Sequence, residues 1–258
     1  ERLPAEEMPE LERWVLHRLW QLDKTVREGC EAFDFTEVYQ ALHNFCAVDL
    51  SAFYFDVRKD SLYCDPAESA RRRACRTVLD ILFDHLTAWL APILCFTAEE
   101  AWQARGKAPD SVHLRLFPEV PEDWRDEELA AKWAKIRAVR RVVTGALELE
   151  RAEKRIGASL QSAPAVYIDD AELAKAVEGV DLAELSITSG LQVEQAPPPA
   201  EAYRLEEVPG VGVVHRPAEG EKCARCWRVL TDVGSHPEAP DACGRCAEAV
   251  AALESAAQ

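Results

Sequence analysis

Residues 223–226, with the sequence Cys-Ala-Arg-Cys, and residues 243–246, with the sequence Cys-Gly-Arg-Cys, decide the fold of the last part of the chain. Two C-x-x-C pairs separated by sixteen residues have the spacing of a four-thiolate zinc ribbon, in which each pair forms a tight knuckle. A module of about 40 residues cannot bury enough apolar surface to fold alone, so a metal would supply much of its folding energy. The sequence therefore predicts one structural zinc ion, bound by Cys223, Cys226, Cys243 and Cys246.

Other interpretations of the cysteine module are weaker. A redox dithiol needs only one C-x-x-C pair, and four thiolates leave no open position for a metal-bound water, so hydrolysis is not expected there. His215 and His236 are alternative ligands that rank below the cysteines, because four thiolates already complete a tetrahedron. Trp227 can stack on an unpaired base or pack as part of the ribbon core, and these two roles stay equally open.

The composition is that of a folded protein from a reducing compartment. The chain has 258 residues, of which 48% are hydrophobic, and its first 30 residues carry charges throughout, unlike a signal peptide. No apolar run approaches the roughly 18 residues of a membrane helix. We therefore expect a cytoplasmic location with no membrane partner and reduced cysteines. Outside the ribbon, five cysteines are expected to be small buried hydrophobes: Cys30, Cys46, Cys64, Cys75 and Cys95.

The formal net charge of −16 argues against non-specific nucleic-acid binding, because an acidic surface repels a polyanion. Positive charge is nevertheless concentrated in two places. Residues 58–76 contain six positive and three negative side chains, and residues 135–155 contain seven positive and three negative ones. Each cluster is either a solvated helix face or a local basic surface.

Hydrophobic periodicity predicts a mainly α fold. Residues 9–105 have apolar positions at three- and four-residue spacing, with a cap at Asp34 and a helix that Pro66 can open, and a long helix is predicted over 127–154. Strands are predicted at 165–168, 185–188 and 211–214, with a helix at 170–177. We therefore expect an antiparallel helical bundle in 1–123, a long helix with a small α/β unit in 124–200, and a linker strand with the zinc ribbon in 201–258.

Several segments resemble the C-terminal part of bacterial isoleucyl-tRNA synthetases. The ribbon sequence over 219–227 and 243–246 is similar to the family's terminal zinc module. Residues 41–45, 49–60 and 91–102 are similar to its anticodon-binding helical bundle, and 154–160 to the segment after its long helix. The resemblance covers essentially the whole chain in the family's order.

The resemblance implies a part of a larger enzyme that joins isoleucine to its tRNA with ATP. The family's His-x-Gly-His and Lys-Met-Ser-Lys-Ser motifs and its editing domain do not occur in this sequence, which begins at Glu1 without a methionine. We therefore interpret the chain as a piece that lacks the ATP-using catalytic domain and is inactive by itself. The implied partners are isoleucine tRNA and the missing N-terminal catalytic domain, and a monomer is expected.

The resemblance also directs attention to residues that would hold tRNA. The family's motifs match at Arg58, Lys59 and Trp227. Ala224 stands where a proline is common in the family, and this departure slightly weakens the argument for the first knuckle but leaves the ligands unchanged. The predicted tRNA-binding residues are Arg58, Lys59, Arg71, Arg72, Arg73, Arg225, Trp227 and Arg228.

Two alternatives from other functional classes remain at this point. A base-excision DNA glycosylase has a C-terminal zinc finger with similar cysteine spacing, but it needs a catalytic N-terminal proline and a strand-rich first domain, and neither is found in this sequence. A freestanding zinc-ribbon interaction protein would bind other proteins through its acidic surface.

Overall fold

The computed structural model describes residues 2–106 and 110–256, and the chain forms two compact units. The first unit comprises Glu1–Arg58 and Glu68–Glu127. The second comprises Lys59–Ala67 and Glu128–Gln258. A short segment from the first half of the chain therefore belongs to the same unit as the cysteine module. The expected three-part division at residues 123 and 200 stays a prediction.

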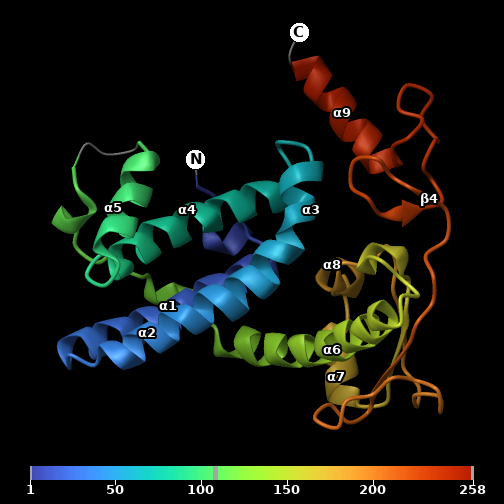
Figure 1. The fold of residues 1–258 in the computed structure, drawn as a ribbon, viewed down its shortest axis with the longest axis horizontal. Helices are drawn as coiled ribbons and strands as arrows, with labels where there is room; N and C mark the ends of the chain where they lie inside the picture. The colour runs from blue at the N-terminus through green and yellow to red at the C-terminus, as the bar shows by residue number, and fades with distance from the viewer. Residues whose placement is uncertain (1, 107–109, 257–258) are drawn as a thin grey trace. The chain divides into compact units, whose positions relative to one another are not determined.

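The first unit is a helical bundle (Figure 1). Helix α1 packs against α2 and α4, and α4 packs against α5. The periodic apolar residues of α1 are all buried, as their spacing predicts: Leu11, Val15, Leu19, Leu22 and Val26. The elements are η1 (Ala5–Glu7), α1 (Glu10–Glu31), α2 (Phe35–Asn44), the π-helical η2 (Phe45–Phe55), α3 (Asp56–Cys64), α4 (Ala70–Leu90), α5 (Cys95–Ala104), η3 (Val112–Leu114) and η4 (Glu122–Trp124). Helix α3 passes from the first unit into the second after Arg58.

The starts of two helices show where local sequence signals succeed and fail. The Asp34 side chain accepts a hydrogen bond from the Glu37 amide, so the predicted cap of α2 is confirmed. The prediction that Pro66 opens the next helix is wrong. Helix α4 begins at Ala70 because the Ser69 hydroxyl caps it by accepting from the Arg72 amide.

The second unit contains the long helix α6 and a small three-stranded sheet. Helix α6 spans Glu127–Ala152, close to its predicted range, and is followed by η5 (Ser159–Gln161). In the sheet, β1 (Ala165–Ile168) lies between β2 (Gln192–Glu194), which is parallel to it, and β3 (Val211–Val214), which is antiparallel. Val166 pairs with Val193 on one side and with Val213 on the other. Strands β1 and β3 coincide with the predicted strands.

The strand predicted at residues 185–188 is wrong. This segment ends a short helix, α8 (Leu182–Ser186), which follows α7 (Ala171–Val177). The Asp181 side chain caps α8 by accepting from the Glu184 amide, and Ile187 then ends the helix in a left-handed conformation with φ of 56°. Leu185 is buried within this helix and Ile187 is half-buried after it, so the burial of Leu185 does not require a strand.

The cysteine module adds a two-stranded hairpin and a final helix. Strand β4 (Glu221–Lys222) pairs antiparallel with β5 (Val229–Leu230), and α9 spans Gly244–Ala256. The mainly α class with a small sheet and a four-cysteine cluster is thereby confirmed. In the described part of the chain, no helix combines the length and apolarity needed to cross a membrane.

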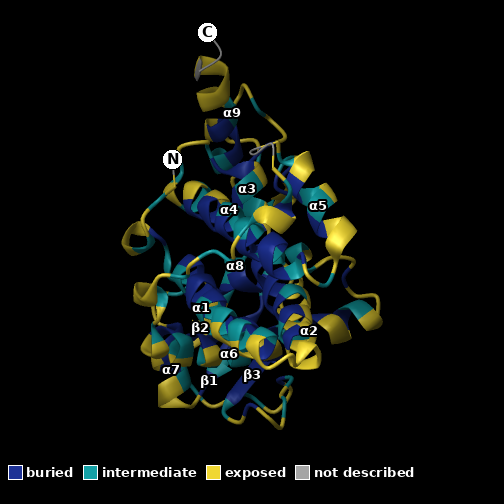
Figure 2. Ribbon diagram, turned by 90° about the vertical axis from the view of Figure 1, so that its left-hand side faces the viewer, coloured by how far each residue is buried: buried dark blue, intermediate teal, exposed yellow. Residues whose placement is uncertain are grey.

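Buried residues line the inner faces of the helices within each unit (Figure 2). Among the five cysteines outside the ribbon, Cys64 and Cys75 are buried as expected, and Cys30 and Cys46 are half-buried. Cys95 is exposed at the start of α5, so the expectation is wrong for that residue.

Candidate metal centre and nucleic-acid interface

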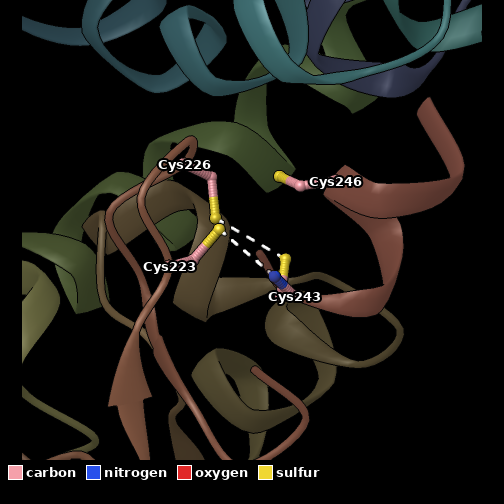
Figure 3. Close-up of side chains that lie close together, drawn as sticks. All are labelled: Cys223, Cys226, Cys243 and Cys246. Carbon is pink, nitrogen blue, oxygen red and sulfur yellow. Dashed lines mark hydrogen bonds between the residues drawn. The ribbon is translucent and has the colours of Figure 1, made fainter. Parts of the chain in front are cut away.

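The four ribbon cysteines converge on one buried point (Figure 3). Their sulfurs all lie within 4.8 Å of one another, and Cys226 Sγ is 3.8 Å from Cys243 Sγ. A tetrahedral zinc site with zinc–sulfur bonds of about 2.3 Å has sulfurs about 3.8 Å apart, whereas a disulfide would bring them to about 2.05 Å. The donor set and its spacing therefore fit zinc and do not fit disulfides.

The two knuckles come from different elements. Cys223 and Cys226 lie in the turn between β4 and β5, and Cys243 and Cys246 lie at the start of α9. The Cys243 amide donates to Cys223 Sγ over 3.3 Å. Burial raises the pKa of Cys226 and Cys243, whereas in Cys223 the same burial is outweighed by amide hydrogen bonds, which lower its pKa to about 6. Zinc would hold all four groups as thiolates, so its binding releases protons.

Neither nearby histidine belongs to this cluster. Among the described residues, the group that can hold a metal consists of the four cysteines alone. His215 Nε2 lies 3.1 Å from the Ser162 hydroxyl, and its Nδ1 lies 3.4 Å from a Glu150 carboxylate oxygen. His236 is half-buried in the loop that precedes the second knuckle.

Trp227 is the aromatic residue that the ribbon presents to solvent. Its side chain is 62% exposed, which contradicts the alternative of a core tryptophan. It follows the first knuckle directly and has a left-handed φ of 66°, so its ring projects from a backbone that the knuckle fixes. Lys222 Nζ lies 5.7 Å from the ring centroid, which places a cation beside the aromatic face. Lys222 is not among the eight predicted tRNA-binding residues, although the sequence places it beside the first knuckle as a cation that could meet a phosphate.

The predicted ribbon arginines are engaged inside the second unit. Arg225 is half-buried and donates to the main-chain carbonyls of Tyr63 and Cys64. Arg228 is also half-buried and donates from Nη2 to the Ser189 carbonyl over 2.9 Å. These partners lie far away in the sequence, so no local signal could have identified them.

Arg58 is also engaged, within the first unit. It is 3% exposed, and its Nε and Nη2 each lie 2.7 Å from an oxygen of Glu12, which is fully buried. The hydroxyl of Tyr54 donates to the same carboxylate over 3.1 Å. The Arg58 guanidinium therefore faces the interior of the bundle, and the sequence reasoning missed Glu12 as its partner.

The remaining predicted cations lie at or near the surface. In the first unit, Arg73 is exposed and Arg71 and Arg72 are half-buried, all three in the first turn of α4. The positive end of the helix dipole lies at the same place and adds to their potential. In the second unit, Lys59 is exposed. Of the eight predicted tRNA-binding residues, Lys59, Arg73 and Trp227 are therefore the exposed ones, and Arg71 and Arg72 lie partly buried beside Arg73.

Known families match both parts of the chain. The anticodon-binding domain of tRNA ligases matches residues 12–167, and the zinc finger found in FPG and IleRS matches residues 220–249. Isoleucine–tRNA ligase of Agrobacterium fabrum is 54% identical over 253 residues, which cover 98% of this chain and 26% of that relative. The enzyme of the same name from Ruegeria pomeroyi is 56% identical over 244 residues, which cover 94% of this chain and 25% of that relative. The chain thus spans about a quarter of the length of the curated relatives it matches.

Proposed function

The chain belongs to the family of anticodon-binding domains of tRNA ligases, and from this premise we propose that it binds the anticodon arm of isoleucine tRNA. Anticodon bases are unpaired, so aromatic stacking and hydrogen bonds to base edges can read them. Arginine and lysine side chains position the sugar–phosphate backbone without reading sequence. The accessible residues of both units fit this division of roles.

One observation carries the proposal more than any other: the exposed Trp227 on the cysteine knuckle. A large aromatic at 62% exposure contributes little to folding, and the left-handed backbone and the adjacent Lys222 hold it in a defined position. Such a ring can stack on an unpaired base, and the neighbouring ammonium can meet the phosphate. The zinc would organise this surface without taking part in catalysis.

The first turn of α4 provides the corresponding phosphate-binding surface of the helical unit. Arg71, Arg72 and Arg73 follow the cap of a long helix, where the dipole favours anions. We propose that these arginines contact the tRNA backbone, together with Lys59 of the second unit. Arg58, Arg225 and Arg228 support the fold around these contacts, because their guanidinium groups are held by protein acceptors.

The complete enzyme would ligate isoleucine to this tRNA with ATP. The chain contributes recognition, and the nucleotide chemistry belongs to a catalytic domain that this sequence does not contain. We expect the chain alone to be catalytically inactive, monomeric and cytoplasmic. The catalytic partner would correspond to the three quarters of the relatives' length that this chain does not cover.

The alternatives have no comparable support. The zinc-finger family includes FPG as well as IleRS, but the anticodon-binding family covers most of the rest of the chain, where a DNA glycosylase would need a strand-rich domain. A freestanding interaction protein is disfavoured for the same reason.

Titration of the zinc-loaded chain with isoleucine tRNA tests the proposal. Binding should persist near about 150 mM salt and be lost when the anticodon is changed. Trp227→Ala should weaken binding by about 1 to 3 kcal/mol, Trp227→Phe should retain most of it, and Val193→Ala, an exposed apolar residue of the same unit, should leave it unchanged. Equal affinity for unrelated duplex DNA would refute the proposal.

A further inference from the structure

Residues 59–67 lie in the second unit although they come from the first half of the chain. The segment begins in the last turns of α3 and ends before α4. Its buried thiol, Cys64, is 4% exposed and packs in the same apolar cluster as the four ribbon cysteines. The cysteine module therefore includes a fifth cysteine and a segment that the spacing of the ribbon does not reveal.

Two arginines attach this segment to the ribbon. Arg225 donates from Nη1 to the Cys64 carbonyl over 2.6 Å and from Nη2 to the Tyr63 carbonyl over 2.9 Å. Arg245 donates to both carboxylate oxygens of Asp60, over 2.5 and 2.8 Å. Its Nη1 also lies 3.3 Å from an oxygen of Asp65. The geometry is that of a planar guanidinium on a matching pair of acceptors, which a lysine cannot reproduce.

The two arginines occupy equivalent places in the two knuckles. Arg225 directly precedes Cys226, and Arg245 directly precedes Cys246. Arg225 Nη1 also lies 3.7 Å from Cys246 Sγ, so the arginine of the first knuckle reaches a sulfur of the second. The contacts to residues 59–67 therefore come from both knuckles, which a bound zinc ion would close.

The acceptors in residues 59–67 are partly shielded from solvent or lie at a helix end. Asp65 is 4% exposed, and the side chains of Arg245 and Asp60 are each 30% exposed, so these ion pairs are shielded from solvent more than an ordinary surface pair. The bonds from Arg225 end on main-chain carbonyls at the end of α3, where a helix lacks internal donors. Arg225 thus supplies donors to carbonyls at the end of a helix, and Arg245 supplies donors to two carboxylates.

We propose that Arg225 and Arg245 are positioning residues through which the zinc-bound knuckles hold residues 59–67 in place. The exposed Lys59 belongs to this segment and directly precedes Asp60. The position of the Lys59 side chain then depends on whether zinc is bound. The effect of this position on tRNA binding rests on the proposed function. The two C-x-x-C pairs thereby have a second role beyond metal binding, since each also places one arginine.

Hydrogen exchange measured by mass spectrometry tests the attachment without tRNA. In the zinc-loaded chain, peptides covering 59–67 should be protected, and chelation should raise their exchange at least tenfold together with that of the ribbon. Arg245→Ala and Arg225→Ala should raise exchange in 59–67 with the metal still bound, and Lys222→Ala, which removes an exposed cation of the same ribbon, should not. The double variant Asp60→Asn with Asp65→Asn should also raise exchange in 59–67, because it removes the charged acceptors of Arg245.

Cobalt substitution separates positioning from metal binding. The tetrahedral cobalt–thiolate spectrum should be unchanged in Arg245→Ala and in the double asparagine variant, and Arg245→Lys should restore only part of the protection of 59–67. Protection of 59–67 that survives chelation, or that survives in the double asparagine variant, would overturn the proposal. Loss of the cobalt spectrum in Arg245→Ala would also overturn it, because the arginine would then act on the metal site itself.

The tRNA titration is a separate readout. Arg245→Ala should weaken tRNA binding by about as much as Lys59→Ala does, since both affect the same contact. If the exchange pattern is as expected and neither the intact chain nor the variants bind tRNA, the attachment stands and the proposed function fails.

Discussion

Replacing Arg58 with alanine should destabilise the helical unit by about 3 to 5 kcal/mol, the usual penalty for removing one partner of a buried ion pair. The pair has good geometry, with two 2.7 Å bonds between the guanidinium and the two oxygens of Glu12. Glu12 is fully buried and Arg58 is 3% exposed, so water cannot replace the lost partner. The hydroxyl of Tyr54 remains as a donor but does not neutralise the carboxylate.

The measurement should report on the helical unit alone, because the unfolding of a chain with two compact units need not be two-state. Hydrogen exchange of peptides from α1 and α4 along a urea series gives the free energy of unfolding of that unit. Arg73→Ala is the matched control, since Arg73 is an exposed arginine of the same unit, and its effect on stability should stay within about 0.5 kcal/mol. Combining Glu12→Leu with Arg58→Met should recover most of the loss, because a buried pair can be replaced by apolar side chains of similar size.

One outcome would refute this reasoning about Arg58. If Arg58→Ala keeps the stability of the unit within about 0.5 kcal/mol but weakens tRNA binding as much as Arg73→Ala does, the side chain must leave its buried site to contact RNA. The original expectation from the family resemblance would then be correct. The structure favours the opposite result, in which tRNA affinity falls only when the bundle is unfolded.

Three further predictions concern the second unit. Gly220→Ala should prevent the ribbon from folding and retaining zinc, because Gly220 has a φ of +106° and an added Cβ would lie 2.2 Å from a main-chain oxygen. Gly179→Ala is the control, since Gly179 has a φ of +72° with no atom within 4 Å of an added Cβ, and it should cost only about 1 to 2 kcal/mol in urea unfolding. Glu150→Gln should destabilise the second unit above about pH 5 and progressively less in acid. Hydrogen bonds from Arg155 lower the pKa of Glu150, so the stabilisation by its carboxylate is lost as the pH falls through that lowered pKa. Urea midpoints measured between pH 7 and pH 3 check this. Trp227→Gly should fold about 0.5 to 1 kcal/mol more stably than Trp227→Ala, because glycine adopts the φ of 66° without strain, while both variants lose the same tRNA affinity.

The sequence predicts the elements well where a local physical rule operates alone. Apolar spacing in α1, strands β1 and β3, and the cap at Asp34 all depend on residues within a few positions of one another. The strand predicted at 185–188 fails because β-branched residues such as Ile187 and Thr188 favour a strand without determining it. There the cap at Asp181 and the left-handed Ile187 decide for a helix, and neither affects the hydrophobic pattern.

The candidate site divides in the same way. The four cysteines could be grouped from spacing because each knuckle is local and zinc accepts only a few arrangements of thiolates. The hydrogen-bond partners of the arginines could not be predicted from the sequence. Arg58 lies 46 residues from its partner in the sequence. Arg225 lies 161 and 162 residues from its two partners, and Arg245 lies 180 and 185 residues from its two partners. A cation in the sequence gives no indication of a buried acceptor that folding brings to it from so far away.

The geometry of the guanidinium group explains why Arg58, Arg225 and Arg228 are held by protein acceptors. In a chain of charge −16, a guanidinium has many carboxylates and carbonyls within reach of its rigid fork, and two or more hydrogen bonds with a protein acceptor compete with one contact to a mobile phosphate. Lysine has a single flexible ammonium that holds its hydration more strongly, so it stays at the surface more readily. Lys59 and Lys222 are exposed, whereas the neighbouring Arg58 and Arg225 are buried or half-buried. We therefore predict that Lys59, Lys222 and Trp227 contact the RNA, whereas the arginines of the two knuckles donate to acceptors in residues 59–67.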